Sequence, residues 1–394
     1  MKKKALIILT ALMLIVGLIG CQAAPDKQAS SGSETTKTND AKTNEEKTDN
    51  EKDGNKDGEA TADFREIKDM SGRTVKVPAK IEKVFGTSEI STLFLYSLAP
   101  DKVAALNREL TADQKKFFDE RIHDLPALGS WKGKGGDTNL EEILKAEPDI
   151  IINMGDMDER YQSGADEMQE KLGIPVLLID GSLENLHDAY RYAGDLLDVK
   201  ERADTLAEYC ETAMAKVTDT VKDIPEKDRL PVYYAVGMDG LETAPKGTIN
   251  TEVLELAGGD NVASTGDKPR GKAVEVSMEQ VLKWDPELIV VSPAFDSETN
   301  EAYDLILKDD KWKDLKAVKN KLVFEIPNLP FNWFNRPPTI NRILGVQWLT
   351  NLLYPEQYDI DPAETAQEFF STFYQVELSD DDIGELLKHA VREK

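Results

Sequence analysis

The sequence contains few of the residues that build disulfide frameworks or metal sites. Its 394 residues include two cysteines and three histidines. Because Cys21 lies in the N-terminal segment, Cys210 has no partner for an intramolecular disulfide, and its helical surroundings predict a small buried apolar residue. His123, His187 and His389 are not paired at metal-ligand spacing, which argues against a bare zinc or manganese site. We therefore predict no metal ligands and no cofactor.

Positive charge is also scarce. Lysine and arginine number 48 against 74 aspartates and glutamates, and the net charge of −26 excludes the basic face that nucleic acid needs. The sequence has no Ser-His-Asp arrangement and no nucleophile elbow, so it predicts no catalytic residue and no enzyme. Residues 266–273 come close to a phosphate-binding loop, but Ala273 replaces the serine or threonine that would hold magnesium.

The N-terminus carries an export pattern. Three lysines at 2–4 precede an apolar run over 5–19, which predicts a secretory signal peptide over 1–20. The alternative, a permanent transmembrane anchor, needs a longer run. The segment Leu18-Ile19-Gly20-Cys21 resembles the lipobox of bacterial lipoproteins. That resemblance implies cleavage before Cys21, lipid on Cys21, and a position outside the cytoplasm on the outer face of the bacterial cell membrane.

The stretch that follows lacks apolar side chains. Residues 22–63 include no valine, isoleucine, leucine, methionine or aromatic residue. Such a stretch cannot bury enough apolar surface to offset the entropy lost on ordering, so we expect a disordered tether.

One pattern occurs twice in the remaining chain. Residues 139–152 and 277–290 match position by position at a constant offset of 138 residues. Each copy predicts a short helix, a turn and a buried parallel strand; in the first copy Asn139 caps the helix, Pro148 ends it, and the apolar run 150–152 forms the strand. The repeat predicts two similar α/β lobes in one chain.

The fold class is therefore α/β: two similar lobes with mostly parallel sheets, joined by a long backbone helix and preceded by the tether. The pattern between the lobes is helical with a break at Asp198. Strands of the first lobe are predicted at 81–85, 102–106, 150–154 and 174–179. The predicted segments are the signal peptide 1–20, the lipidated cysteine and linker 21–63, the N-terminal lobe 64–182, the helical segment 183–224, and the C-terminal lobe with terminal helices 225–394.

Four stretches in this order resemble a known family: 69–78, 139–141 with 148–151, 256–262, and 276–279 with 286–289. The family is the class III substrate-binding proteins of ABC importers, the helical-backbone group that serves iron–siderophores, haem and cobalamin. The resemblance covers about residues 64–376. It implies that a cleft between the lobes binds a small-molecule metal chelate and that the chain works with a membrane permease and its ATPase.

The resemblance also implies a docking role for one exposed glutamate on each lobe. The matching positions are Glu141 and Glu279, which both fall at the second position of a predicted helix, where the cap does not need them. The alternative is that acids simply favour the first helical turn, where each is worth about 0.3–1 kcal/mol.

Ligands of open α/β sheets bind beyond the carboxyl ends of the strands. Aromatic and basic residues near those ends predict a partly flat, anionic ligand such as a ferric siderophore, haem or a corrinoid. The candidates for ligand contact share this placement; they are Trp131, Lys132, Met154, Met238, Arg270, Trp333 and Arg336. The alternative for Trp131 and Trp333 is packing within the lobes.

Three functions follow from these observations. The first is a lipid-anchored receptor that delivers an iron complex, siderophore or haem, to an ABC importer. The second is a receptor of the same fold for molybdate, tungstate or a corrinoid. The third, from a different class, is a chelatase acting on a tetrapyrrole, because related folds host such enzymes. The lack of a suitably placed histidine counts against it.

Overall fold

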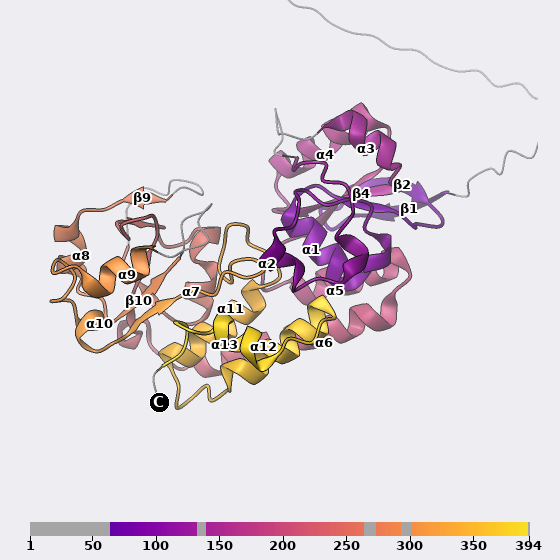
Figure 1. The fold of residues 1–394 in the computed structure, drawn as a ribbon. Coiled ribbons are helices and arrows are strands. Elements are labelled where there is room, and N and C mark those ends of the chain that lie inside the picture. The colour runs from indigo at the N-terminus through magenta and orange to yellow at the C-terminus, as the bar shows by residue number, and fades with distance from the viewer. Residues whose placement is uncertain (1–63, 132–138, 264–272, 293–300, 393–394) are drawn as a thin grey trace, which may run out of the picture. The chain divides into compact units, whose positions relative to one another are not determined.

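The computed structural model describes residues 64–131, 139–263, 273–292 and 301–392, which form two α/β lobes with helices between them (Figure 1). All of these residues belong to one compact unit, 60–394. None of the helices in the described ranges combines the length and the apolar character that a membrane span requires.

The first lobe is built on a parallel sheet in the order β3-β4-β5, preceded by an antiparallel hairpin of β1 and β2. The strands are β1 (Phe64–Lys68), β2 (Thr74–Pro78), β3 (Val84–Gly86), β4 (Ile150–Gly155) and β5 (Val176–Asp180). Its helices are α1 (Glu89–Leu98), α2 (Ala112–Lys115), α3 (Leu140–Ala146) and α4 (Glu159–Leu172), with 3-10 turns η1 (Pro100–Lys102) and η2 (Glu120–Ile122).

One predicted strand of this lobe is wrong. Residues 102–106 make only two isolated parallel bridges, Val84 with Val103 and Leu106 with Ala127. The segment contributes Val103 and Leu106 to the apolar core without joining the hydrogen-bond ladder of β3. An apolar run predicts burial, and here burial occurs without a continuous strand.

The second lobe holds a parallel sheet in the order β11-β10-β6-β8 and a small antiparallel pair, β7 with β9. Its strands are β6 (Pro231–Ala235), β7 (Glu242–Thr243), β8 (Asp260–Asn261), β9 (Val274–Glu275), β10 (Leu288–Val291) and β11 (Val323–Glu325). Its helices are α7 (Glu252–Leu256), α8 (Met278–Trp284), α9 (Glu301–Lys308) and α10 (Lys316–Lys319), with 3-10 turns η3 (Glu226–Asp228) and η4 (Ile249–Thr251).

The repeat predicted from the sequence is confirmed in three dimensions. α3 and α8 start and end at equivalent positions, and both end in a left-handed residue, Glu147 at φ 49° and Asp285 at φ 44°. The strands that follow, β4 and β10, each lie between two parallel neighbours. Asn139 and Ser277 cap the two helices by accepting backbone hydrogen bonds through their side chains.

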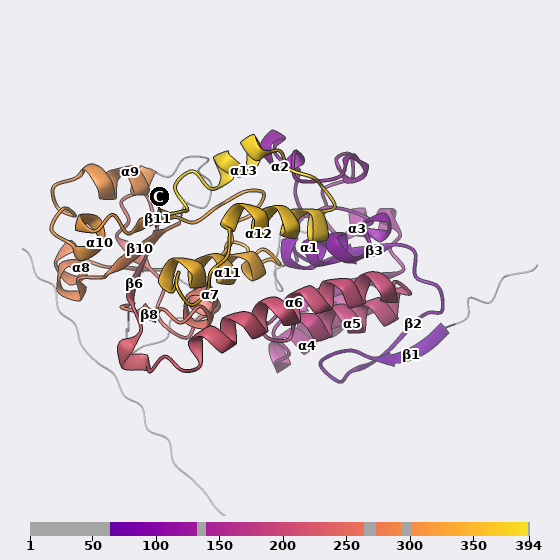
Figure 2. The ribbon, with the colours of Figure 1, turned by 90° about the horizontal axis from the view of Figure 1, so that it is seen from below.

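One long helix, α6 (Lys200–Val221), joins the lobes along one side, and α5 (Leu186–Leu197) packs against it beside the first lobe (Figure 2). The predicted break is confirmed at Asp198, which ends α5 at φ 58°. Asp198 thus terminates the first helix, whereas Val199 occupies the N-cap of the second. Cys210 is a free, buried residue on the apolar face of α6, as predicted, and burial raises the pKa of its thiol well above the usual range.

The C-terminal helices are α11 (Arg342–Leu353), α12 (Pro362–Phe369), the π-helical turn η5 (Phe370–Tyr374) and α13 (Asp380–Leu386). α11 lies beside α6, and α12 with η5 carries the chain back to α1 of the first lobe (Figure 2). The Tyr96 hydroxyl of α1 donates to the Tyr374 carbonyl at 2.6 Å, and α1 packs against η5. One apolar cluster therefore runs from Val75 in the first lobe to Ala390 near the C-terminus.

Candidate ligand-binding site

A cavity of about 460 Å³ lies between the two lobes. Its first wall follows the carboxyl ends of β4 and β5 and consists of Ile90, Gly155, Asp156, Tyr161, Gly181, Ser182 and Glu184. Its second wall comes from η4, α7 and the start of α11 and consists of Gly247, Thr248, Ile249, Glu252, Glu255, Leu256, Pro338 and Arg342. The cavity thus occupies the edge of the sheet where ligands of open α/β folds bind.

Two glycines shape the first wall. A Cβ atom at Gly155 would lie 2.2 Å from Cε1 of Tyr161, so the absence of a side chain lets the tyrosine ring lie directly against the strand end. The backbone of Gly181 lies directly against that of Gly155, and the Gly181 backbone N–H donates to the Gly155 carbonyl at 3.0 Å. Burial raises the pKa of the Tyr161 hydroxyl, so this side chain offers the cavity a neutral phenol.

A buried guanidinium joins the two walls. Arg342 is 3% exposed; it donates to the Gly181 carbonyl at 2.7 Å and pairs with the Glu252 carboxylate. Glu252 also accepts a hydrogen bond from the backbone N–H of Leu183 at 3.3 Å. Burial lowers the pKa of the Arg342 guanidinium, and the neighbouring Glu252 acts in the opposite direction. The ion pair therefore makes two hydrogen bonds from one lobe to the other, one donated by Arg342 and one accepted by Glu252.

Acidic side chains dominate the described lining. Four carboxylates, Asp156, Glu184, Glu252 and Glu255, contribute to it, against the single cation Arg342, which is already paired. Glu252 and Glu255 are held by hydrogen bonds: Glu255 accepts from the Gly247 N–H at 2.6 Å and from the Thr251 hydroxyl at 2.8 Å. Asp156 and Glu184 are exposed. The described walls thus present negative charge to whatever enters.

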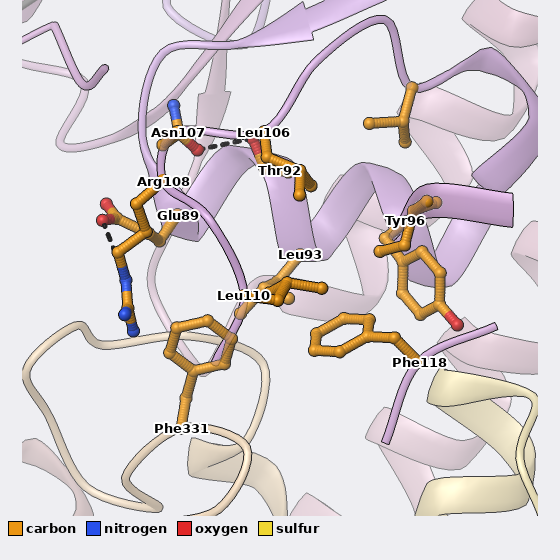
Figure 3. A pocket seen from close by; sticks show the side chains of 12 residues that line it. Glu89, Thr92, Leu93, Tyr96, Leu106, Asn107, Arg108, Leu110, Phe118 and Phe331 are labelled. Atoms are coloured by element: carbon orange, nitrogen blue, oxygen red, sulfur yellow. Dashed lines mark hydrogen bonds and ion pairs between the residues drawn. The ribbon is translucent and has the colours of Figure 1, made fainter. Parts of the chain in front are cut away.

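The lobes also touch at a second, much smaller cavity of about 20 Å³ (Figure 3). The Arg108 guanidinium lies over the Phe331 ring, 5.3 Å from its centre, and makes a loose ion pair with Glu89. Phe331 meets Phe118 edge to face, and the Gln114 side chain donates to the Pro330 carbonyl at 2.7 Å. A space of this size holds about one water molecule, so we interpret it as the packing seam between the lobes.

The predicted contact residues do not converge on one cavity in this structure. Trp333 is fully buried and meets Trp348 edge to face at 6.2 Å, which matches the packing alternative. Met154 is also buried, at 3% exposure. Neither side chain is available to a ligand here, which corrects the expectation for both, and Trp333 instead belongs to the apolar core.

Three other predicted residues keep exposed surface. Trp131 is partly buried against the first lobe, with Lys171 over its ring, and its backbone N–H donates to the Thr87 carbonyl at 2.7 Å. Met238 is 66% exposed on the turn after β6. Arg336 is half-buried, and its backbone has a positive φ of 68°.

Some predictions lie outside the described residues, namely those for Lys132, Arg270 and the lipidated Cys21. The two docking candidates, Glu141 and Glu279, are both exposed at the second position of α3 and α8. Within the described ranges, no group of three or more histidine, cysteine, aspartate or glutamate side chains gathers as a metal site.

Sequence reasoning missed the residues that build the cavity walls. Tyr161 and Glu252 sit in ordinary amphipathic patterns and carry no local signal. Arg342 does carry one: a lone arginine opens a helix that continues Ile343-Leu344-Gly345-Val346, and a charge in so apolar a helix indicates a buried pair.

Comparison with known proteins decides the family. Residues 132–329 match the family described as periplasmic binding protein. An ABC transporter solute-binding protein from Sulfurospirillum deleyianum is 32% identical, with a TM-score of 0.74 over 82% of this chain and 99% of that one. The chain is a periplasmic binding protein. The class III family resemblance and the two-lobed α/β fold expected from the sequence are thereby confirmed.

Two further relatives cover most of this periplasmic binding protein. The molybdate-binding protein MolA of Haemophilus influenzae is 24% identical over 81% of this chain and 93% of its own length. A periplasmic solute-binding protein from Veillonella parvula shares the fold at 23% identity, with a TM-score of 0.67 over 83% of this chain and 98% of that one. Members of the family are substrate carriers of ABC importers, so this protein acts outside the cytoplasm as a carrier and is not an enzyme.

Proposed function

We propose that this protein captures an iron complex, a siderophore chelate or haem, in the cavity between its lobes and delivers it to the permease and ATPase of an ABC importer. The observation that supports this most is the cavity itself: about 460 Å³, with walls from both lobes, at the carboxyl ends of β4 and β5. Pockets of about 300–1,000 Å³ are typical for organic ligands of moderate size.

The alternative ligands are molybdate or tungstate, and a corrinoid. Relatives named as molybdate-binding, vitamin B12-binding and haem-uptake proteins support all of these as candidates. A bare tetrahedral oxyanion would fill only a small part of the cavity. The cavity volume therefore favours a chelate over a bare oxyanion.

The described lining also favours a particular ligand charge. Asp156 and Glu184 are exposed on the first wall, whereas the only cation of the described lining, Arg342, is buried and paired. An anionic ligand would meet repulsion from these carboxylates in a site partly shielded from solvent. Of the two iron complexes we therefore favour a neutral or positively charged siderophore chelate over haem, whose propionates are anionic, and over the anionic ligand that the aromatic and basic residues of the sequence predict.

Ligand titration tests this proposal. Tryptophan fluorescence of the purified protein is followed while a ferric hydroxamate chelate, a ferric catecholate chelate, haem, cobalamin or molybdate is added. We expect saturation by the ferric hydroxamate, the iron complex with the least negative charge, at about micromolar concentration or below. Saturation by molybdate alone or cobalamin alone would replace the iron complex by that ligand, and saturation by none of the five would refute the proposal.

Docking through Glu141 and Glu279 is the second part of the proposal. Asn139 and Ser277 supply the caps of α3 and α8, so neither helix needs these two glutamates for its cap. Glu141→Ala with Glu279→Ala should leave ligand affinity unchanged and reduce uptake by cells. Glu142→Ala is the matched control, because Glu142 is the next residue of α3 and pairs with Lys145. Unchanged uptake in the double variant would remove this role.

Lipid anchoring at Cys21 is the third part. The Leu18-Ile19-Gly20-Cys21 segment supports it. Cys21→Ser should move the protein from the membrane fraction to the fluid outside the cell membrane, and retention of this variant in the membrane fraction would contradict lipidation at this residue.

A further inference from the structure

Two leucines occupy the same place in the two copies of the repeat and are both exposed. Leu144 on α3 is 47% exposed and Leu282 on α8 is 43% exposed. They are 138 residues apart, which is the offset of the repeat. Single exposed apolar residues are common on protein surfaces, but an exposed leucine kept at both equivalent positions calls for a shared reason.

The burial pattern of α3 and α8 indicates the direction in which these leucines point and the residue that lies beside each. Ile143 and Val281, the residues just before them, are fully buried and hold each helix on its lobe. The leucines therefore point away from the lobes. Each follows a glutamate by three residues, Glu141 before Leu144 and Glu279 before Leu282, and residues three apart share one face of a helix. Each lobe thus shows an exposed carboxylate beside an exposed leucine.

We infer that Glu141 with Leu144, and Glu279 with Leu282, form two equivalent docking patches for the two halves of a twofold-symmetric permease. This inference rests on the docking role proposed above and adds the leucines to it. Each half of the permease would offer a cationic side chain next to an apolar depression. The carboxylate orients and attracts the partner, whereas the leucine adds contact area that loses water on docking.

The two contributions differ in their dependence on salt. Attraction between exposed charges weakens as ionic strength rises, because ions screen it. Burial of a leucine involves no charge and keeps its contribution at high salt. Substitution of the leucines should therefore weaken docking at every salt concentration, and substitution of the glutamates should weaken it chiefly at low salt.

The experiment titrates the full-length protein against the cognate permease–ATPase complex in lipid nanodiscs, at low and at high salt. The variants are Leu144→Gln, Leu282→Gln and both together, because glutamine is a good helix former. The matched control is Leu307→Gln on α9, a leucine that is 44% exposed but lies outside the repeat. Ligand affinity and the thermal midpoint are measured for every variant to show that the fold is intact.

We expect each leucine variant to lower the affinity for the permease about tenfold at both salt concentrations, because each leucine is already about half buried. The control should bind like the natural sequence. If the leucine variants bind like the control while Glu141→Ala and Glu279→Ala weaken docking, the leucine inference falls and the docking proposal stands. If neither set weakens docking, both fall. An effect of only one leucine would overturn the equivalence of the two patches.

Discussion

Arg342 donates a hydrogen bond of 2.7 Å to the carbonyl oxygen of Gly181, so a guanidinium at the start of α11 is fixed to the end of β5 in the other lobe. The same guanidinium pairs with Glu252, whose carboxylate accepts from the Leu183 N–H. A buried charge is tolerated only when it is paired and hydrogen-bonded, and here all partners lie on the cavity walls or beside them. The ligand site and the lobe contact thus share one ion pair.

Removing Arg342 should be costly. Arg342→Met leaves Glu252 without its partner in a largely buried place, and we expect a loss of about 3–5 kcal/mol in the free energy of unfolding. Urea denaturation measures it. Arg342→Met combined with Glu252→Gln should lose less than the sum of the two single variants, since the double variant leaves no isolated charge. Additive losses would show that the two side chains act independently.

Gly155→Ala should weaken ligand binding. The new methyl group would lie 2.2 Å from the Tyr161 ring, so the ring must leave its place on the cavity wall. We expect about tenfold lower ligand affinity, equivalent to ~1.4 kcal/mol, and a stability loss of about 1–3 kcal/mol from overpacking. Ligand titration and urea denaturation measure the two effects. Unchanged affinity would mean that the Tyr161 ring does not contribute to the site.

Gly164→Ala, on the helix that carries Tyr161, is the opposite case. Gly164 lies inside α4, and a Cβ atom there would have no atom within 4 Å. Alanine loses less backbone entropy on folding than glycine, so we expect a gain of about 0.5–1 kcal/mol in the free energy of unfolding with ligand affinity unchanged. A loss of stability in urea denaturation would contradict the open surroundings of this residue.

Asp119 should contribute to stability in a defined pH range. Hydrogen bonds from the Arg121 side chain and backbone lower the pKa of Asp119 to about 2. At pH values between about 2 and the ordinary aspartate pKa of about 3.9, this carboxylate binds a proton more readily in the unfolded chain than in the folded protein. Its contribution to the free energy of unfolding is therefore complete above about pH 4 and disappears as the pH falls through about 2.

The effect of Asp119 is small because its carboxylate is 34% exposed and solvent screens the pair. We expect at most about 1 kcal/mol. Asp119→Asn should destabilise the protein at pH 6 and have little effect near pH 2 in urea denaturation. An equal effect at both pH values would show that the carboxylate charge is not its cause.

The sequence predicted those helices and strands whose ends are set by residues nearby in the chain. The cap, the left-handed end and the proline after α3 and α8 all lie within the two copies, so the repeat predicted both helices and both central strands. The break at Asp198 was predictable for the same reason, since a helix end depends on the residues of one turn. The exposure of Glu141 and Glu279 follows from their place in those helices.

Long-range contacts account for what the sequence did not predict. Trp333 and Trp348 pack together although no pattern relates them, so Trp333, a predicted ligand contact, is part of the core. The cavity walls depend on Tyr161 lying against Gly155 and on Arg342 reaching Gly181, contacts made between different elements. A periodic pattern indicates that a side chain is buried, but it does not indicate what covers it.

The apolar cluster that runs from Val75 to Ala390 has a consequence for how the chain folds. The lobes that carry the two copies of the repeat share this one apolar cluster. A chain cut after Val221 would leave the apolar side of α6 without α11, and each fragment would expose a surface prone to aggregation. Unfolding should therefore be a single cooperative transition in which neither lobe opens alone.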